Sequence, residues 1–284
     1  MNTKEGFLNT AKTLAEALPF LQRYDGAIIV IKLGGHAMTD LAAMKSFARD
    51  IVLMKQCNVN PIIIHGGGPM INATLGKLNI TSKFHEGKRI TTEEIMEVVE
   101  MVLSGKVNKS IVSALNEQGG KAVGLSGKDS SLIYCEQDTP ELGFVGKIME
   151  INPEVLNSFI DSDFIPVVAP IGYGNNSKTY NINGDTVAGA LASGLNADRL
   201  LLLTDVEGVK SSDGNLIPQL DPIRARKLIK DGVISEGMIP KVNTALNAIE
   251  NGVRASVIID GRVEHSCLLE LFTSHGAGTL FRNS

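Results

Sequence analysis

The sequence is poor in cysteine and in long apolar runs, and this excludes several classes of protein. Its three cysteines are far apart and not at metal-ligand spacing: Cys57, Cys135 and Cys267. An odd, scattered set favours free thiols in a reducing compartment. The apolar runs are too short to cross a bilayer, and residues 1–24 lack the continuous apolar core of a signal peptide. We therefore expect a cytoplasmic protein with no membrane partner.

The chain also lacks an excess of basic residues. Its 27 Lys and Arg residues are outnumbered by 31 Asp and Glu residues, the net charge is −4, and the positive charges form no block. Nucleic acid is therefore not an expected partner. An anionic ligand would have to be held by a few locally placed charges rather than attracted by the whole surface.

No linker rich in glycine, proline and serine divides the chain, so its organisation is inferred from hydrophobic periodicity. Short apolar strands are expected over 26–35, 61–68, 121–127, 164–172, 198–206 and 255–261. Helices are expected over 41–56, 93–118 (bent near Gly105) and 185–196, with hairpin character over 143–151. Because the strands are continuously apolar, we expect an α/β fold with an open, mainly parallel sheet sandwiched between helices.

Residues 1–24 are predicted to form an amphipathic helical extension, with a break at Pro19. Its apolar positions are Phe7, Leu8, Ala11, Leu14, Ala15 and Leu18. Periodicity leaves two interpretations open, a cap over the core or a helix that docks on another subunit. The loose segment 173–178 is taken as the division between an N-terminal lobe, 25–178, and a C-terminal lobe, 179–284.

The familiar phosphate-binding motifs are missing. The nearest candidate for a Walker A loop, around Gly127 and Lys128, has Ala122 at the first glycine and Asp129 in place of Ser or Thr. No G-x-G-x-x-G fingerprint is present, and neither are the H-R-D and D-F-G signatures of protein kinases. Any phosphate site must therefore use another arrangement.

The segment IIIHGGGPM, residues 62–70, offers such an arrangement. A strand ends in Gly66, Gly67 and Gly68 just before a helix, where bare backbone N–H groups suit an anion. A simple tight turn explains the glycines equally well at this point. His65 is interpreted as a packed strand-end residue rather than a catalytic one.

Four charged residues are of interest for their positions in the predicted elements, because each could lie at the site of an anionic ligand. Lys32 lies in an apolar strand, which is unfavourable unless it is paired or directed at an anion. Asp185 opens a helix, where a capping role is the simplest interpretation. Lys241 starts another helix against the macrodipole, which favours a specific partner. Arg89 lies in a loop and says little by itself.

Taken in order, short motifs along nearly the whole chain resemble the amino acid kinase family. They are VIKLGG, IIIHGGGP, GKRIT, GLSGKD, LGFVGKI, NINGDTVAGALA, LLTDVEGV, GMIPKV and IIDGR. The resemblance is strongest to members that phosphorylate the γ-carboxylate of N-acetyl-L-glutamate in arginine biosynthesis. It implies that the N-terminal lobe takes the acyl amino acid and the C-terminal lobe takes ATP, with Mg²⁺ held largely through the nucleotide phosphates and no metal-binding residues expected.

The resemblance also implies roles for residues at matching positions. The catalytic residues would be Lys32, Lys241 and Asp185, the aspartate holding the two lysines. The substrate would lie against Gly67, Gly68, Arg89, Asn181 and Asn183. The nucleotide would lie against Lys32, Gly34, Gly35, Thr204, Asp205, Gly208, Gly237, Met238 and Lys241.

The two ends of the chain resemble those of arginine-inhibited members, which assemble as homohexamers through interlaced N-terminal helices. Glu270 and Gly276 would contact the inhibitor arginine. One departure is Val257, where those members often carry a histidine. Three alternatives stay open: a sibling kinase for glutamate, aspartate, carbamate or UMP; a catalytically weak arginine-sensing protein; and, least favoured, a dinucleotide-binding oxidoreductase.

Overall fold

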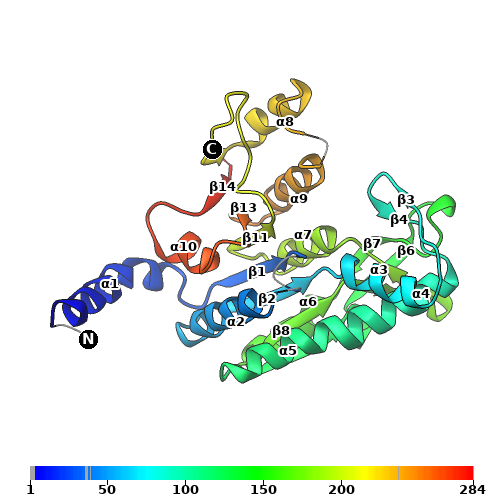
Figure 1. Ribbon diagram of the computed structural model, residues 1–284, viewed down its shortest axis with the longest axis horizontal. Coiled ribbons are helices and arrows are strands. Elements are labelled where there is room, and N and C mark those ends of the chain that lie inside the picture. Colours follow the sequence, from blue (N-terminus) through cyan, green and yellow to red (C-terminus); the bar gives the residue numbers. More distant parts are fainter. Residues whose placement is uncertain (1–3, 36–37, 39, 236, 284) are drawn as a thin grey trace.

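The fold is built around one sheet that runs through the whole molecule. The computed structural model describes residues 4–35, 38, 40–235 and 237–283 (Figure 1). An eight-stranded sheet has the order β12-β14-β13-β11-β1-β2-β8-β5. Its strands are β1 Ile28–Leu33, β2 Asn60–His65, β5 Ala122–Ser126, β8 Ile165–Ala169, β11 Arg199–Thr204, β12 Gln219–Leu220, β13 Ser256–Asp260 and β14 Gly278–Phe281. Among the described strands of this sheet, only β13 and β14 pair in antiparallel fashion, which confirms the mainly parallel sheet.

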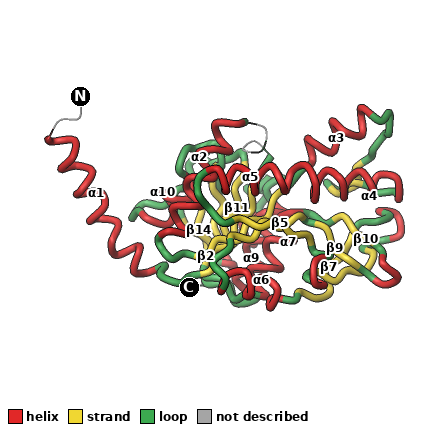
Figure 2. The backbone as a smooth tube through the Cα atoms, turned by 90° about the horizontal axis from the view of Figure 1, so that it is seen from below, coloured by secondary structure: helices red, strands yellow, loops and turns green. Residues whose placement is uncertain are grey.

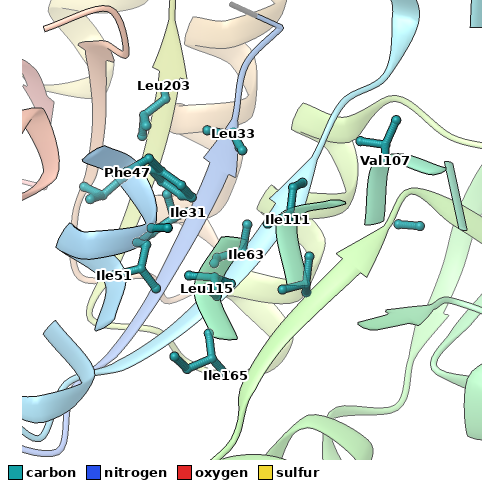
Figure 3. Packing of buried hydrophobic residues seen from close by; sticks show 14 of the residues in the cluster. Ile31, Leu33, Phe47, Ile51, Ile63, Val107, Ile111, Leu115, Ile165 and Leu203 are labelled. Carbon is teal, nitrogen blue, oxygen red and sulfur yellow. The ribbon is translucent and has the colours of Figure 1, made fainter. Parts of the chain in front are cut away.

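Helices cover both faces of this sheet, as the continuously apolar strands predicted. One layer contains α2 Leu41–Gln56, α3 Gly68–Lys77, α4 Glu93–Glu100, α5 Asn108–Glu117 and α10 Ser266–Phe272. The other contains α6 Pro153–Asp161, α7 Gly184–Gly194, α8 Pro222–Lys230 and α9 Ile239–Glu250. Side chains alternate along each strand, so Ile31 and Leu33 face the first layer (Figure 3) while Val30 faces the second.

A smaller sheet and a hairpin complete the half of the molecule that holds β5 and β8. The sheet has the order β10-β9-β6-β7. Its strands are β6 Ile133–Gln137, β7 Gly146–Ile151, β9 Ile171–Tyr173 and β10 Thr179–Asn181, and the hairpin is β3 Phe84–His85 with β4 Lys88–Arg89. The hairpin expected over 143–151 supplies one arm, β7, whose antiparallel partner is β6. Segment 173–178 is the turn between the paired strands β9 and β10, and a division into lobes there stays a prediction.

The long helical segment 93–118 is distorted where a bend was predicted. Between α4 and α5 the backbone forms a π-helix, Met101–Val107, which includes Gly105. A π-turn widens the helix locally and accommodates an extra residue. Three of its side chains, Val102, Leu103 and Val107, are buried in the core.

The N-terminal helix α1, Lys4–Arg23, extends away from the rest of the molecule (Figures 1 and 2). The predicted break at Pro19 is wrong, because the helix continues through the proline to Arg23. One missing backbone donor in the last turns is tolerated where the helix end is fixed by packing, and Tyr24 packs edge-on against Phe272 with ring centroids 6.4 Å apart. No helix in the described ranges is long and apolar enough to span a bilayer.

Candidate functional site

A cleft of about 660 Å³ opens beside the carboxyl ends of β1 and β2. This edge is where ligands bind in open α/β sheets. The cleft brings together seven of the predicted residues: Lys32, Gly67, Gly68, Arg89, Asn181, Asn183 and Asp185. These residues lie on β1, at the β2–α3 corner, on β4, on β10 and at the start of α7. The fold therefore places residues from Lys32 to Asp185, which are distant in the sequence, around one cleft.

Lys32 and Asp185 form an ion pair on the floor of the cleft. The Lys32 Nζ lies 2.9 Å from the Asp185 Oδ1, and the side chains are only 14% and 11% exposed. This pairing explains how a lysine is tolerated in an apolar strand, since Lys32 lies on the face of β1 that meets α7. The contact does not have hydrogen-bond geometry, and the buried Asp185 Oδ1 accepts no hydrogen bond from the described residues. Asp185 also lines the cleft, so its carboxylate can be approached by a further donor from that side.

The helix cap of α7 is Asn183 and not Asp185, so the capping interpretation of Asp185 is wrong. The Asn183 Oδ1 accepts hydrogen bonds from the backbone N–H groups of Asp185 and Thr186 at 2.8 and 3.2 Å. The cap fixes the first turn of α7 and so places the Asp185 side chain toward Lys32. The Asn183 oxygen is occupied by this role, which leaves its amide N–H groups for a ligand.

Two of the three glycines at the corner between β2 and α3, Gly67 and Gly68, differ in what a side chain there would meet. A Cβ on Gly68 would meet open space, as expected for backbone that a ligand approaches. A Cβ on Gly67 would instead collide with Leu103 of the π-helix. Leu103 therefore occupies the space of a side chain on Gly67, and both residues line the cleft, so that a role of Gly67 at the substrate stays a prediction. Gly34 is similar, because its Cβ would lie 2.7 Å from the Leu203 carbonyl oxygen.

His65 is a packed residue, as predicted. Its side chain is fully buried; the Nδ1 donates to the Gly66 carbonyl at 2.8 Å and the Nε2 lies 3.3 Å from the Asn108 amide nitrogen. Burial lowers the pKa of His65 to about 4, so the ring is neutral at physiological pH.

Arg89 is the most informative residue that the sequence left undecided. Its side chain is 7% exposed, and no carboxylate of the described residues pairs with it. Burial lowers the pKa of Arg89, although a guanidinium stays protonated in proteins. A buried, charged group that faces a cleft without a counter-ion favours an anionic ligand. Nearby, the Asn181 amide donates to Thr91 Oγ1 at 3.3 Å, which orients it along the same wall.

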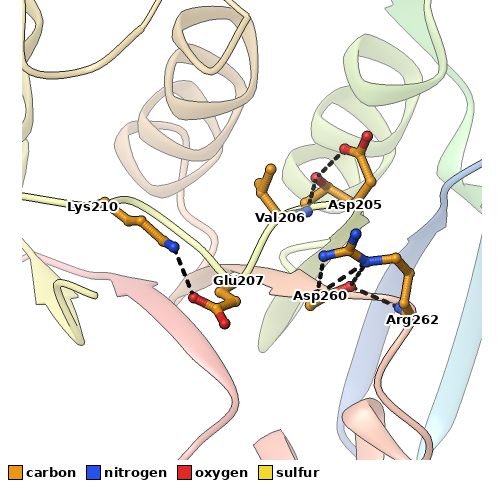
Figure 4. A network of polar contacts seen from close by, with 7 residues as sticks. Asp205, Val206, Glu207, Lys210, Asp260 and Arg262 are labelled. Atoms are coloured by element: carbon orange, nitrogen blue, oxygen red, sulfur yellow. Dashed lines mark hydrogen bonds and ion pairs between the residues drawn. The ribbon is translucent and has the colours of Figure 1, made fainter. Parts of the chain in front are cut away.

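A second hollow of about 390 Å³ lies beyond the end of β11. It contains three of the residues predicted to border the nucleotide: Asp205, Gly208 and Met238. Figure 4 shows polar contacts around it, where Arg262, which lines the hollow, donates to both carboxylate oxygens of Asp260, Nε to Oδ1 at 2.9 Å and Nη2 to Oδ2 at 2.7 Å. Gly208 has φ +145°, and a Cβ there would lie 2.6 Å from Thr279 Oγ1, so only glycine fits.

The remaining predicted residues line neither space. They are Gly34, Gly35, Thr204, Gly237 and Lys241. Thr204 ends β11 and its Oγ1 accepts from the Val206 N–H at 3.2 Å, which shapes the loop of the second hollow. Lys241 lies in the first turn of α9, and Thr244 and Asn247 of the same helix line the first cleft. Lys241 is therefore one helical turn from the cleft and has no ion-pair partner among the described residues.

Sequence reasoning missed an ion pair at the cleft. The Lys88 Nζ lies 2.5 Å from the Asp138 Oδ2, and both residues line the cleft. Lys88 lies in the GKRIT motif, next to Arg89, so the motif could have indicated that Lys88 lies at the cleft. Asp138 is 50 positions further along the chain, in a loop without a motif, and nothing in the sequence indicated that the two meet.

The two residues predicted to contact arginine are adjacent near the base of α1. The Glu270 Oε2 accepts from the Ala277 N–H at 2.8 Å, and a Cβ on Gly276 would lie 3.0 Å from that oxygen. Burial raises the pKa of Glu270. The Arg199 guanidinium lies 5.5 Å from the Tyr24 ring centroid, and its buried Nε has no hydrogen-bond partner among the described residues. Val257 is buried in β13, one strand away from Arg199.

Comparison with known proteins agrees with the fold and the motifs. Residues 27–260 match the amino acid kinase family. The acetylglutamate kinase of Ruegeria pomeroyi is 60% identical over 97% of this chain and 96% of its own length, and that of Paracoccus denitrificans is 58% identical over 98% and 92%.

Solved structures show the same architecture at low identity. N-acetylglutamate synthase from Neisseria gonorrhoeae, complexed with coenzyme A and N-acetyl-glutamate, has a TM-score of 0.87 at 24% identity, over 96% of this chain and 63% of that chain. Carbamate kinase from Giardia lamblia bound to AMP-PNP has a TM-score of 0.68 at 18% identity, over 91% and 99%. With its sequence match, its parallel sheet and its strand-end cleft, the chain belongs to the amino acid kinase family.

Proposed function

We propose that this protein transfers the γ-phosphoryl group of ATP to the γ-carboxylate of N-acetyl-L-glutamate, as a cytoplasmic step of arginine biosynthesis. The observation that carries the proposal is that one cleft holds a lysine–aspartate pair, bare backbone at Gly68 and the buried, unpaired Arg89. A substrate with carboxylates at both ends matches two separate anion-binding groups. The names and full-length similarity of the relatives support the same substrate.

The chemistry requires positioning and charge neutralisation rather than a base. A side-chain carboxylate has a pKa near 4.3 and is already ionised at neutral pH. One of its oxygens bonds to the γ-phosphorus while the bond from that phosphorus to the β–γ bridging oxygen breaks, and ADP carries away the electron pair. The difficulty is repulsion between two anions, which at about 4 Å amounts to roughly 4 kcal/mol per unit pair near a protein surface. Lys32, Lys241 and the backbone amides of the corner would offset it.

Each lobe has a distinct part in this proposal. The first cleft takes the acylated amino acid, with Arg89, Asn181 and Asn183 around its α-substituents. The second hollow, with Asp205, Gly208 and Met238, takes the nucleotide. Mg²⁺ would supply further positive charge at the nucleotide phosphates. Asp185 would hold Lys32 and, with its free acceptor capacity, Lys241 when the lobes approach each other.

One assay separates this function from its rivals. ADP release is measured with N-acetyl-L-glutamate, L-glutamate and L-aspartate, with and without L-arginine. We expect turnover of the acetylated substrate only. Preference for a free amino acid would identify a sibling kinase. No turnover of any of the three would refute the proposed function and leave an arginine-sensing protein, a carbamate or UMP kinase, or an oxidoreductase.

We also propose feedback inhibition by arginine at the junction of α1, β11 and α10, in a homohexamer built through α1. The supporting observation is that a half-buried carboxylate, Glu270, and a buried guanidinium with a free Nε, Arg199, lie at the same junction. Such a pair suits a ligand with a guanidinium at one end and a carboxylate at the other. Glu270→Gln should raise the inhibitory concentration of arginine at least tenfold and leave uninhibited turnover unchanged; inhibition equal to wild type would refute the site.

A further inference from the structure

Arg89 is held by neutral groups on every side that the structure describes. Its Nη2 donates to the Asn72 Oδ1 at 2.7 Å, and its Nη1 donates to the Ser82 Oγ. The Phe84 ring lies against the guanidinium, with the ring centroid 4.6 Å from the Cζ. The neighbouring charged residue of the cleft, Lys88, pairs with Asp138 and so does not leave that carboxylate for Arg89.

These contacts come from three separate segments of the chain. Asn72 lies in the second turn of α3, and Ser82 precedes β3. Phe84 is the cross-strand partner of Arg89 in the β3–β4 hairpin. Because a guanidinium is planar and has five N–H donors, a stacking ring and two acceptors fix its orientation and leave other N–H groups for a ligand.

The neutrality of the acceptors has an electrostatic consequence. A carboxylate at position 72 could form a bidentate ion pair with Arg89. This pair would compensate the positive charge of the guanidinium before any ligand bound. An amide oxygen holds the same geometry without removing the charge. Helix α3 also begins at Gly68, so the residue that orients Arg89 and the bare backbone of the corner belong to one rigid element.

We propose that Asn72, supported by Ser82, is a positioning residue that holds Arg89 ready for the α-carboxylate of the substrate while keeping its charge uncompensated. The inference rests on the proposed function, because it names which substrate group Arg89 receives. Helix α3 would then set the distance between the binding sites of the two carboxylates of the substrate. Its first residue, Gly68, borders the carboxylate that is phosphorylated, and its second turn, with Asn72, orients Arg89, which binds the α-carboxylate.

The test uses Asn72→Asp, which has the same shape and adds the charge that the structure avoids. Asn72 is exposed as a residue, so the substitution is compatible with folding, which thermal denaturation checks. We expect the KM for N-acetyl-L-glutamate to rise about tenfold or more, while kcat and the KM for ATP stay within about twofold. Ala73→Asp is the matched control: it adds the same charge to the next exposed position of α3, about 100° further round the helix, and should behave as wild type.

A double-mutant cycle with Arg89→Gln distinguishes positioning from general damage. If Asn72 acts through Arg89, Asn72→Asp should add less than about twofold to the loss in kcat/KM that Arg89→Gln already causes. An unchanged KM in Asn72→Asp, or losses that multiply in the double variant, would overturn the inference. Failure of wild-type protein to phosphorylate N-acetyl-L-glutamate would instead overturn the proposed function, so the two failures are distinct.

Discussion

Leu103 of the π-helix occupies the space that a side chain on Gly67 would need. A Cβ on Gly67 would lie far inside van der Waals contact with the Leu103 Cδ2, whereas the Leu103 Cγ and the Val107 Cγ2 would both be 3.7 Å away. The π-helix Met101–Val107 thus packs against the corner between β2 and α3 through Leu103 and Val107. The other side of the corner, at Gly68, is open.

This relationship predicts that Gly67→Ala destabilises the protein by overpacking, by about 1–3 kcal/mol. In a Leu103→Ala background, which has its own cavity penalty of about 2–5 kcal/mol, the same substitution should be harmless, because the methyl group then fills vacated space. Urea unfolding of the four proteins of this cycle measures the coupling. Equal effects of Gly67→Ala in both backgrounds would contradict the packing explanation.

Gly68→Ala provides the contrasting case. Its Cβ would meet nothing within 4 Å, so the free energy of unfolding should change by less than about 1 kcal/mol. Turnover should nevertheless fall at least tenfold, because the methyl group intrudes on backbone that the reacting anions approach. Activity close to wild type in a stably folded Gly68→Ala protein would count against the corner as the site of transfer.

Substitutions of Lys32 and Lys241 should have similar effects on turnover but different effects on the stability of the protein. Lys32→Ala removes the partner of a nearly buried carboxylate, so it should lower both turnover, by about a hundred- to a thousandfold, and the unfolding temperature. Lys241→Ala should lower turnover by a similar factor and leave the unfolding temperature unchanged, because Lys241 has no ion-pair partner among the described residues. Exposed Lys227→Ala on α8 is the control for loss of one positive charge. Turnover that survives either Lys32→Ala or Lys241→Ala would refute charge neutralisation by these lysines.

His65 predicts a specific dependence of stability on pH. Burial lowers its pKa to about 4, against 6.5 for the unfolded chain, so the unfolded state binds more protons between these values. The free energy of unfolding should therefore fall as the pH drops from 6.5 to about 4, with a contribution from His65 of roughly 3 kcal/mol. His65→Gln, which keeps a donor and an acceptor, should show a shallower slope over this interval in chemical denaturation. An identical slope would mean that the ring is accessible to protons in the folded state.

The apolar stripe of α1 predicts assembly. Phe7, Leu8, Leu14 and Leu18 are between 53% and 68% exposed, which is unusual for large apolar side chains that recur along one helix. Leu14→Glu should reduce the mass in light scattering to a smaller oligomer and weaken arginine inhibition, while Lys12→Glu on the same helix should not. A mass that is unchanged by Leu14→Glu would exclude α1 as the assembly element.

The sequence predicted most where a pattern repeats and least where contacts are non-local. Continuous apolar strands indicated a sheet covered on both faces, and an uncompensated lysine in one of them indicated a partner, which proved to be Asp185. The sequence could not show that Asn183 caps α7 in its place, because both residues suit a helix start and only the backbone decides between them. It also could not join Arg89 to Asn72 or Lys88 to Asp138, since no periodicity links a helix or a distant loop to a short hairpin. Pro19 shows the opposite error, because a local rule was overridden by packing at the helix end.

The π-helix Met101–Val107 determines how α5 is rotated about the helix axis relative to α4. Leu103 lies within this π-helix, and Asn108, whose amide reaches His65 and the Val167 carbonyl, begins the next helix. The π-helix accommodates one extra residue, so that Leu103 and Asn108 both reach the strand end around His65 and Gly67. If the same residues formed ordinary α-helix throughout, the segment after the extra residue would be rotated by about 100°, and Asn108 would turn away from His65. The wide turn thus keeps two side chains of one helical segment directed at the same strand end, and deleting a single residue there should preserve that relation.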